Sequence, residues 1–387
     1  MPDLMKYLID GIAGVALFMA LMVVFVVDKV FFSGAGRASE NTLRVNVIED
    51  KSHGAKKLKL AVTPPGTSKK VTGKGVDLWD DMGKLLRDLG QGYRYDEVTP
   101  DEMLLNPKRL DGYDVLFLTC APDGMNLKEI LREFVANGGI LYASDWRRDA
   151  VAAAFPDLVD QKLIGEGAAQ GLEADVVDPA LREVIGPKIH LTFDLGEWKT
   201  AAFSGPRVKP LIQGQYIKRK ELGQQFSDIA TAPLMVKMSF NKGTIIFTSF
   251  HNEKQNSEIE KKLLQYLVFS LVTAGIDADI NSKLGESGFT SKGSNLLSAP
   301  KRNQSIVKNY ENKAKSDLRF ALGFRNEGAK LRFNIKSPEG QEYTWEGMST
   351  VIIDVPGAAP GEWTYTVTDL HLPYENFAFT VTVGEKK

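Results

Sequence analysis

The sequence predicts an α/β protein whose mostly parallel sheet is flanked by helices, with a C-terminal β-sandwich and one N-terminal transmembrane helix. Three patterns predict this fold class. Between residues 57 and 276, short apolar segments alternate with segments of helical period, as in β-α-β crossover units. Beyond residue 305, apolar residues recur at every second position, which is typical of short strands in a sandwich. Residues 8–27 are apolar except for Asp10, and about 20 such residues span a bilayer as a helix.

Composition limits the classes of function. The chain has 387 residues and a formal net charge of -1 with both signs interspersed, so it lacks the basic face that nucleic-acid binding requires. Cys120 is the single cysteine, which rules out disulfides within the chain and fits either side of a membrane. No glycine-rich phosphate loop opens a helix after a strand, so neither a nucleotide nor another cofactor is expected.

The N-terminal apolar run predicts a single-pass membrane protein with an anchor at 1–32. The run continues through Phe32, beyond the apolar core of a cleavable signal peptide, although residues 33–36 leave a cleavage site open as the alternative. Positive residues after the run, such as Arg37 and Arg44, favour a cytoplasmic body by the positive-inside rule. The very short leader and the C-terminal sandwich favour an extracytoplasmic body, which we expect, while the cytoplasmic side stays open.

The α/β domain is expected at 57–276, after a tether at 33–56. Near-continuous apolar strands fit a parallel sheet covered on both faces. Strands are expected at 57–62, 93–98, 114–120 and 140–143, and helices at 77–89, 100–105, 127–136 and 148–155.

The second half of this domain is less regular. Residues 156–225 are punctuated by Gly, Pro and Asp, so we expect an insertion over the sheet, with a helix at 178–185 and a strand at 190–193. Strands at 233–240 and 244–250 flank a turn, which predicts an antiparallel hairpin, and a helix at 257–273 follows.

A stretch rich in Ser, Gly, Asn and Lys predicts a linker at 277–305, before a sandwich at 306–387. Five strands of the sandwich are expected, at 318–324, 330–335, 349–355, 362–367 and 376–383.

Polar residues follow three of the buried strands. Asp145 comes after the strand at 140–143, His251 and Glu253 come after the strand at 244–250, and Cys120 ends the strand at 114–120. Ligands of open α/β sheets gather beyond the carboxyl ends of the strands, so one shared site is expected. The candidate ligand-binding residues are Cys120, Asp145, Trp146, Arg147, His251 and Glu253.

The order of these segments resembles the class I glutamine amidotransferase-like fold, in the divergent branch that includes trehalose-utilisation-type domains. The similarity lies in residues 110–118, in the strand after Gly138-Gly139 and in the strand from Gly243 to His251, and it covers over half of the chain. The resemblance implies a flavodoxin-like sheet. In the C-terminal region, the Pro-Gly-Glu-Trp segment ending at Trp363 resembles a strand entry of extracellular immunoglobulin-like modules.

The resemblance also implies roles for individual positions. In active members, a cysteine follows the Gly-Gly strand on a tight turn, and a later histidine, often with a glutamate two residues on, acts as its base. Asp145 stands at the position of that cysteine, while His251 and Glu253 match the histidine and the glutamate. The oxyanion loop, here residues 119–124, also departs from the pattern, so glutamine hydrolysis is not expected.

Two interpretations of the site follow. Asp145 and His251 could form an acid/base pair or part of a metal site. We favour the other interpretation, a polar remnant that closes strand ends and caps the next helix. Cys120 is interpreted as a small buried hydrophobe rather than a reactive thiol. No metal is expected, because the remaining histidines have no ligand spacing around them: His53, His190 and His371.

The predicted function is that of a membrane-anchored, non-catalytic binding or scaffolding subunit of a membrane complex, with a protein partner. A homo-oligomer is compatible with this role. One alternative is a hydrolase of a small or glycan-derived substrate, with His251 as general base and Asp145 orienting it. The other is a glycan-binding surface module that uses Trp345 and Trp363, although aromatics at alternate strand positions more often belong to the core.

Overall fold

The computed structural model describes residues 42–50, 58–69, 76–122, 125–219, 228–255, 257–299 and 304–386. These residues belong to one compact unit, Asn41–Lys387. The predicted anchor at 1–32 and the first part of the predicted tether lie outside the described residues. The division of the chain into domains stays a prediction, but several elements differ from those expected.

The main sheet has nine strands and is mixed. Its strand order is β10-β9-β12-β13-β14-β7-β6-β2-β5. The pairs from β14 to β5 are parallel, and the pairs from β10 to β14 are antiparallel. The flavodoxin-like, mostly parallel sheet expected from the sequence is therefore wrong. The strands are β2 (Leu60–Val62), β5 (Tyr95–Glu97), β6 (Val115–Leu118), β7 (Ile140–Ser144), β9 (Gln170–Val176), β10 (Lys188–Phe193), β12 (Val208–Ile217), β13 (Ile229–Phe240) and β14 (Gly243–Thr248).

Three strands of the antiparallel half, β9, β10 and β12, come from residues 156–225, where an insertion over the sheet is expected, and β13 comes from the expected antiparallel hairpin. In β9 and β10 every second residue is buried. Half-buried antiparallel strands need apolar residues on one face alone, so Gly, Gln and Lys fill the other positions. This is why the segment looks irregular in the sequence. Two further short strands, β8 (Glu166–Gly167) and β11 (Trp198–Lys199), pair with each other beside the sheet.

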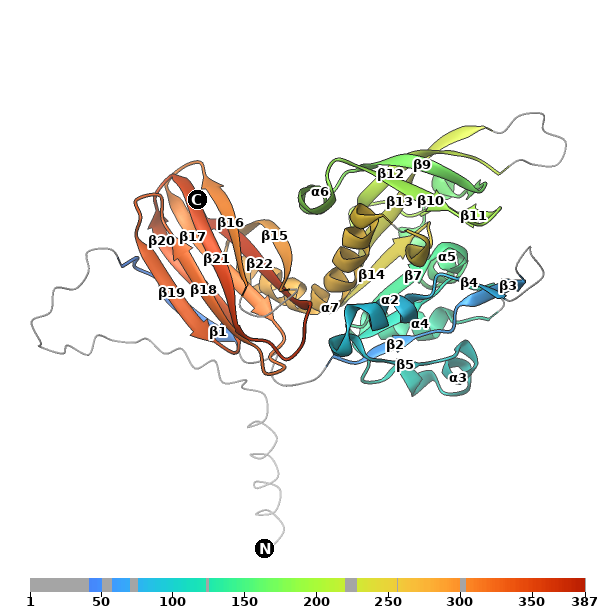
Figure 1. Cartoon of the computed structure of the whole chain (residues 1–387), viewed down its shortest axis with the longest axis horizontal. Helices are drawn as coiled ribbons and strands as arrows, with labels where there is room; N and C mark the ends of the chain where they lie inside the picture. Colours follow the sequence, from blue (N-terminus) through green and yellow to red (C-terminus); the bar gives the residue numbers. More distant parts are fainter. Residues whose placement is uncertain are drawn as a thin grey trace, which may run out of the picture. The chain divides into compact units, whose positions relative to one another are not determined.

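Helices cover both faces of the nine-stranded sheet (Figure 1). Buried residues of one face share a core with α2, α6 and α7. The opposite face shares a core with α3, α4 and α5. The helices are α2 (Met82–Leu89), α3 (Pro100–Leu105), α4 (Lys128–Ala136), α5 (Arg148–Ala154), α6 (Pro179–Ile185) and α7 (Glu258–Glu286).

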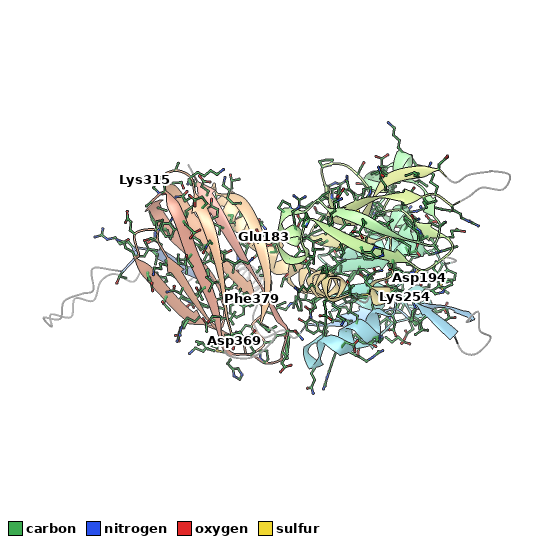
Figure 2. All side chains as sticks on the ribbon, turned by 45° about the horizontal axis from the view of Figure 1, so that its top comes forward. Glu183, Asp194, Lys254, Lys315, Asp369 and Phe379 are labelled. Carbon is green, nitrogen blue, oxygen red and sulfur yellow. The ribbon has the colours of Figure 1, made fainter. Side chains whose placement is uncertain are left out.

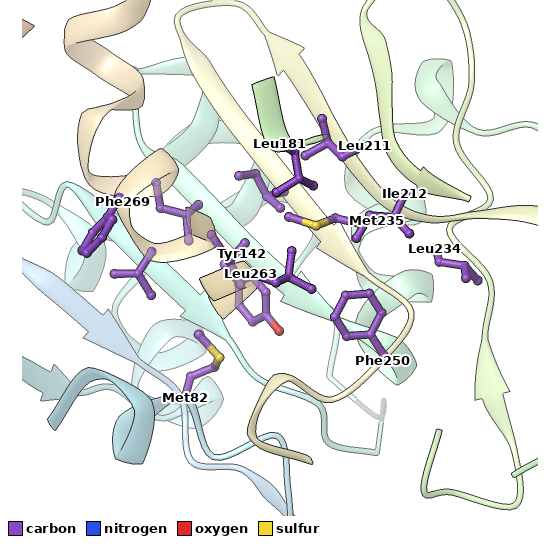
Figure 3. Packing of buried hydrophobic residues seen from close by; sticks show 14 of the residues in the cluster. Met82, Tyr142, Leu181, Leu211, Ile212, Leu234, Met235, Phe250, Leu263 and Phe269 are labelled. Atoms are coloured by element: carbon purple, nitrogen blue, oxygen red, sulfur yellow. The ribbon is translucent and has the colours of Figure 1, made fainter. Parts of the chain in front are cut away.

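Figure 3 shows the first of these cores, where Tyr142 of β7 lies among apolar side chains that include Met82 of α2 and Leu263 of α7. Alternate residues of each parallel strand enter opposite cores, as Leu141 enters the second core while Tyr142 enters the first. Strands β2, β6, β7 and β14 are buried on both faces, whereas the edge strand β5 is largely exposed. Their carboxyl ends, where the predicted site residues lie, are therefore anchored in packed protein.

The C-terminal region is rich in strands and has two sheets around a shared core. Their orders are β1-β20-β17-β22-β15 and β16-β21-β18-β19. Trp345 and Trp363 belong to this core, with exposed fractions of 5% and 1%, so neither ring lies on a surface where a glycan would stack. The strands are β1 (Asn46–Asp50), β15 (Thr290–Ala299), β16 (Ser305–Asn312), β17 (Ser316–Phe324), β18 (Lys330–Lys336), β19 (Glu342–Gly347), β20 (Thr350–Ala358), β21 (Gly361–His371) and β22 (Phe377–Lys386).

Two segments expected to be tether and linker are strands of this region. Asn46–Asp50 pairs with β20 along the edge of the five-stranded sheet. Thr290–Ala299 pairs with β22 at the other edge. An edge strand is held by backbone hydrogen bonds on one side, so its composition can be polar. Composition alone therefore misidentified the linker segment, whereas the alternation at residues 43–48 allows one short strand in the tether.

Helix α7 has 29 residues and extends well past the predicted end at residue 273. Among the described residues, its segment Lys261–Glu286 is long and apolar enough to cross a membrane, but 67% of its most apolar window is buried inside the protein. Leu263 to Ala274 pack in the core beside the nine-stranded sheet. Ile276, Ile280 and Leu284 pack against Ala321 and Ile352 of the C-terminal region. The two successive cores explain the apolar composition of the helix without a membrane.

Candidate functional site

The candidate site lies at the carboxyl ends of three adjacent parallel strands. Cys120 follows β6 by two residues, Asp145 follows β7 directly and His251 follows β14 by three residues. Since β6, β7 and β14 are neighbours, their ends meet at one edge of the sheet. The ligand atoms of Cys120, Asp145 and His251 all lie within 4.8 Å of one another, and all three residues are buried. The structure thus brings together three of the six candidate residues.

Asp145 occupies a constrained backbone position. Its φ of 45° lies in the left-handed region, at a turn between β7 and the short helical segment Asp145–Arg147. Aspartate tolerates this region better than most residues, because its short side chain makes local hydrogen bonds. The Oδ1 atom of Asp145 accepts a hydrogen bond of 2.6 Å from the backbone N–H of Lys199. The turn and this bond fix the carboxylate and direct it into the site.

His251 lies between two carboxylates. Its Nε2 is 3.3 Å from Oδ2 of Asp145, and its Nδ1 is 2.9 Å from Oδ1 of Asp194. Both distances are within the range of an ion pair, yet neither ring nitrogen has a partner in hydrogen-bond geometry. Asp194, just after β10, was not among the residues predicted from the sequence. It lies near Lys254, at the same end of the sheet (Figure 2).

The two carboxylates are in different electrostatic surroundings. Burial alone would lower the pKa of His251, but Asp145 and Asp194 raise it well above its ordinary value. Burial raises the pKa of Asp145 and outweighs the opposing effect of His251. Burial also acts to raise the pKa of Asp194, but there the contact with His251 prevails and the pKa is lowered. The pKa values of the two carboxyls beside the imidazole are therefore shifted in opposite directions.

Cys120 completes the cluster but is not an activated thiol. Its Sγ lies 3.8 Å from Oδ2 of Asp145, and its backbone N–H donates to Oγ of Ser144. Burial raises the pKa of the thiol to about 11, against the opposing effect of His251. A thiolate is the nucleophilic form of cysteine, so the thiol is inert at neutral pH without a bound cation. This agrees with the interpretation of Cys120 as a buried small residue.

A second polar cluster adjoins the first and was missed in the sequence. Asp80 is fully buried and has a φ of 58°. Its carboxylate accepts hydrogen bonds from the hydroxyl of Tyr142 at 2.6 Å, from Oγ of Ser144 at 2.5 Å and from the backbone N–H of Asn252 at 2.7 Å. These bonds join the ends of β7 and β14 to the start of α2. The sequence analysis placed residue 80 inside a helix, although Asp81 before Met82 was a helix-capping signal.

An ion network lies over one side of the site. Lys199 of β11, 7% exposed, pairs with Glu166 and with Glu197, and Arg219 pairs with the same two carboxylates. The ammonium of Lys199 is also 4.9 Å from the ring centroid of Trp146. Since the backbone of Lys199 holds Asp145, this network connects the short β8–β11 ribbon to the site.

The side chains of Trp146 and Arg147 are engaged by backbone carbonyls. The indole N–H of Trp146 donates to the carbonyl of Glu197 at 3.1 Å. Arg147 is 3% exposed and its Nε donates to the carbonyl of Thr119 at 3.0 Å. Glu253 lies in the helical turn Asn252–Lys254, and its side chain is outside the described part of the structure.

Two cavities of the described part of the chain, of about 420 Å³ and 280 Å³, lie away from this cluster. The first lies between α6, α7 and β22, where Lys209, Tyr266 and Thr380 contribute to its wall, and the second lies beside Arg319 of β17. Neither is lined by Cys120, Asp145 or His251. The arrangement forms a closed polar site.

Comparison with known proteins finds distant likenesses alone. A glutamine amidotransferase from Thermotoga maritima is 12% identical with a TM-score of 0.32, and the match covers 60% of this chain and 91% of that one. A β-galactosidase from Bacillus circulans sp. alkalophilus is 13% identical with a TM-score of 0.31, over 78% of this chain and 42% of that one. A β-galactosidase from Rahnella sp. R3 is 10% identical with a TM-score of 0.30, over 80% and 41%. No family model and no curated protein matches the sequence. At these identities and TM-scores, the structural likenesses carry no argument for a family or an activity.

Proposed function

We propose that this protein is a non-catalytic binding subunit of a membrane complex, anchored by its N-terminal apolar segment. In this proposal the site at Asp145 and His251 stabilises the sheet and transforms no substrate. The binding function lies on the surface of the protein, which a protein partner contacts.

The closure of the site carries the proposal. The side chains of Asp145 and His251 are each 1% exposed. A general base must come within hydrogen-bond distance of the proton that it removes, directly or through one water molecule. A buried imidazole held between two carboxylates has no such access. The position where the amidotransferase-like pattern has its cysteine is also occupied by a carboxylate, which the backbone of Lys199 restrains.

An apolar spot on the β12–β13 hairpin supports a protein partner. Ile217 and Ile229 are directly opposite each other across the two strands, which run side by side in Figure 1. Their exposed fractions are 45% and 70%. Directly opposite side chains lie about 5 Å apart, so the two isoleucines form one continuous apolar surface. Interface cores are depleted of charge, and this pair meets that requirement.

The test compares three variants of the full chain, purified from its native membranes in mild detergent. Mass spectrometry quantifies the proteins that remain bound. The double variant Ile217→Lys, Ile229→Lys is expected to lose a stoichiometric partner by tenfold or more, because two ammonium groups would be desolvated at the contact. The double variant Asp145→Ala, His251→Ala is expected to retain it. Gln215→Lys, which adds a charge at an exposed position of the same strand, is the matched control.

Circular dichroism and gel filtration first establish that each variant is folded. Loss of the partner from folded Asp145→Ala, His251→Ala protein would contradict the proposal, because the site would then serve recognition. Hydrolysis of an ester or glycoside panel that disappears in the same variant would establish the hydrolase alternative. Equal loss from Gln215→Lys would remove the hairpin as the contact surface.

A further inference from the structure

We propose that Cys120, Asp145 and His251 bind a zinc ion, with Asp194 positioning the histidine. The inference concerns the chemistry of the buried cluster and does not depend on the proposed partner. The sequence analysis allows Asp145 and His251 as part of a metal site but expects no metal, because the ligands come from three strands and show no ligand spacing along the chain.

Two of the three distances between donor atoms are close to those of a tetrahedral zinc site, and all three lie within 4.8 Å. Zinc binds nitrogen and oxygen at about 2.0 Å and sulfur at about 2.3 Å, so tetrahedral donors lie about 3.3 Å apart for nitrogen and oxygen, and about 3.5 Å apart for sulfur and oxygen. Nε2 of His251 and Oδ2 of Asp145 are 3.3 Å apart. Sγ of Cys120 and the same Oδ2 are 3.8 Å apart. The site is therefore close to ligating geometry without a rearrangement of the strands.

The surrounding residues orient each ligand as a metal site requires. A zinc-binding histidine usually donates its other ring N–H to a carboxylate, which fixes the tautomer. Here Nδ1 of His251 faces Asp194 at 2.9 Å, leaving Nε2 toward Asp145 and Cys120. Oδ1 of Asp145 is occupied by the N–H of Lys199 at 2.6 Å, which leaves Oδ2 on the side of the cluster. Both ligands are thus held by neighbours that do not compete for the ion.

The buried histidine also provides independent evidence. His251 is 1% exposed, and its Nε2 lies 3.3 Å from Oδ2 of Asp145 without hydrogen-bond geometry. Buried polar atoms nearly always have partners, and each exception requires an explanation. A cation bonded to Nε2 would satisfy that atom. It would also stabilise the thiolate form of Cys120, which burial otherwise disfavours.

The donor set selects the metal. Thiolate, imidazole and carboxylate together suit zinc, whereas calcium and magnesium prefer oxygen alone. Three protein ligands leave a fourth position for a water molecule. Three protein ligands with an open position are the pattern of catalytic zinc sites, whereas structural sites have four, but burial of all three ligand residues would here close that position to a substrate.

The experiment measures metal in the full chain, purified in detergent under reducing conditions, saturated with zinc and desalted. Mass spectrometry of the elements is expected to find about one zinc per chain in the wild type and a tenfold or greater loss in Cys120→Ala and His251→Ala. The control is His190→Ala, which removes an exposed histidine that pairs with Glu173 on the edge strands. It is expected to retain zinc at the wild-type level.

A second readout keeps the test independent of the folding of the variants. Cobalt(II) added to metal-free wild type is expected to give the near-ultraviolet charge-transfer band of a thiolate–cobalt bond and the visible bands of a tetrahedral ion. Asp194→Asn is expected to keep the stoichiometry but to weaken zinc affinity about 10- to 100-fold, as the loss of a positioning partner does. A residue that merely supports the fold would not change affinity at constant stoichiometry.

Three outcomes would overturn the inference: wild type that holds no zinc after saturation, His190→Ala that loses as much zinc as Cys120→Ala, or bound cobalt without a thiolate band. Partner retention in the wild type is scored separately. A metal-free protein that still holds its partner would refute the zinc site alone, and a zinc-loaded protein without a partner would refute the proposed function alone.

Discussion

At the scale of single residues, two aspartates with positive φ carry much of the local order. Asp145 has a φ of 45° and Asp80 a φ of 58°, and both carboxylates accept hydrogen bonds from buried donors. Such backbone conformations cost free energy and persist when the surroundings determine them. The side-chain hydrogen bonds and the backbone conformation therefore depend on each other at both positions.

Asp145→Ala is expected to destabilise the metal-free protein more than Asp145→Asn. Alanine leaves the N–H of Lys199 without its acceptor and places a side chain that makes no local hydrogen bond at positive φ, a combined cost of about 2–4 kcal/mol. Asparagine keeps an acceptor and tolerates the left-handed region. Urea denaturation with a chelator present measures both free energies of unfolding. Equal destabilisation by the two variants would show that the bond from Lys199 contributes nothing.

Tyr142→Phe tests the cluster around Asp80. The change removes a hydroxyl that donates to Asp80 at 2.6 Å, so the buried carboxylate loses one of its donors. We expect the free energy of unfolding to fall by about 1–3 kcal/mol. The control is Tyr310→Phe, whose hydroxyl lies 3.5 Å from Glu385 in half-buried surroundings and should cost less than about 0.5 kcal/mol. A result in which both variants lose the same amount would argue against a special role for the Asp80 cluster.

The site was partly predictable at this scale, and the reason is specific. Asp145 and His251 follow apolar strands, and parallel strands end at a common edge, so their meeting could be inferred from the sequence. Asp194 follows β10, an antiparallel strand four positions away from β14 in the sheet order. Its approach to His251 depends on how the antiparallel half packs and curls, which no local pattern encodes.

At the scale of elements, the β8–β11 ribbon shows how charge holds a small element against the site. The ribbon has a single pair of two-residue strands, too few backbone bonds to be stable alone. Backbone bonds such as that from Ala168 to Ile217 attach it, and Lys199 adds charge, since its ammonium meets Glu166 and Glu197 and its backbone meets Asp145. This attachment makes the ribbon sensitive to pH.

Burial acts to raise the pKa of Glu166, but Lys199 and Arg219 lower it below its ordinary value. A carboxyl with a depressed folded-state pKa contributes stability above its unfolded pKa of about 4.3, and this contribution is lost as the pH falls through the lower folded value. The stability gap between wild type and Lys199→Met is therefore expected to be largest near pH 7 and to shrink below about pH 4.

Urea titrations at several pH values between about 3 and 7 measure this gap. Because the side chain of Glu166 is 36% exposed, the pH-dependent part is expected to stay within about 1 kcal/mol. The control is Lys188→Met, which removes an exposed lysine paired with Asp175. A gap that stays constant over the whole range would mean that Lys199 acts by packing on Trp146 rather than by charge.

Secondary structure was predictable where a strand or helix is buried along one whole side. The helix at α4 and the strands β6 and β7 agree with the sequence pattern within one or two residues at most ends. Strand β1 overlaps residues 43–48, where the apolar alternation allows one short strand within the predicted tether. Strand β15 was missed, because an edge strand is held by its backbone and can carry Ser, Gly and Lys. The flavodoxin-like prediction failed for the same kind of reason, since it assigned the half-buried antiparallel strands to an insertion.

At the scale of the whole described unit, α7 connects the two cores. One part of the helix packs beside the nine-stranded sheet and the next part packs on the five-stranded sheet. Further contacts join the same two regions, including the bond from Nδ2 of Asn376 to the carbonyl of Leu89 at 3.0 Å. Unfolding of one core therefore exposes apolar surface of the other, which favours a single cooperative transition.

Ile280→Ala tests the role of α7 in this coupling. Ile280 is fully buried between the helix and the five-stranded sheet, so its truncation is expected to cost about 2–5 kcal/mol. Ile259→Ala near the start of α7, where the side chain is 47% exposed, should change stability by less than about 0.5 kcal/mol. Differential scanning calorimetry measures both. Two separated unfolding transitions in Ile280→Ala would indicate that this contact couples the cores. A loss of stability in Ile259→Ala as large as that in Ile280→Ala would contradict the packing described.

The pairing of β1 with β20 has a consequence for synthesis on the ribosome. Asn46 of β1 pairs with Asp354 of β20. The edge strand β1 is therefore synthesised before the other strands of its sheet, and its partner follows about 300 residues later. At about 5–20 residues per second, the nascent N-terminal strand waits some tens of seconds with its hydrogen-bonding edge unpaired. A chaperone, or the membrane surface if the predicted anchor inserts early, would have to shield that edge until translation is almost finished.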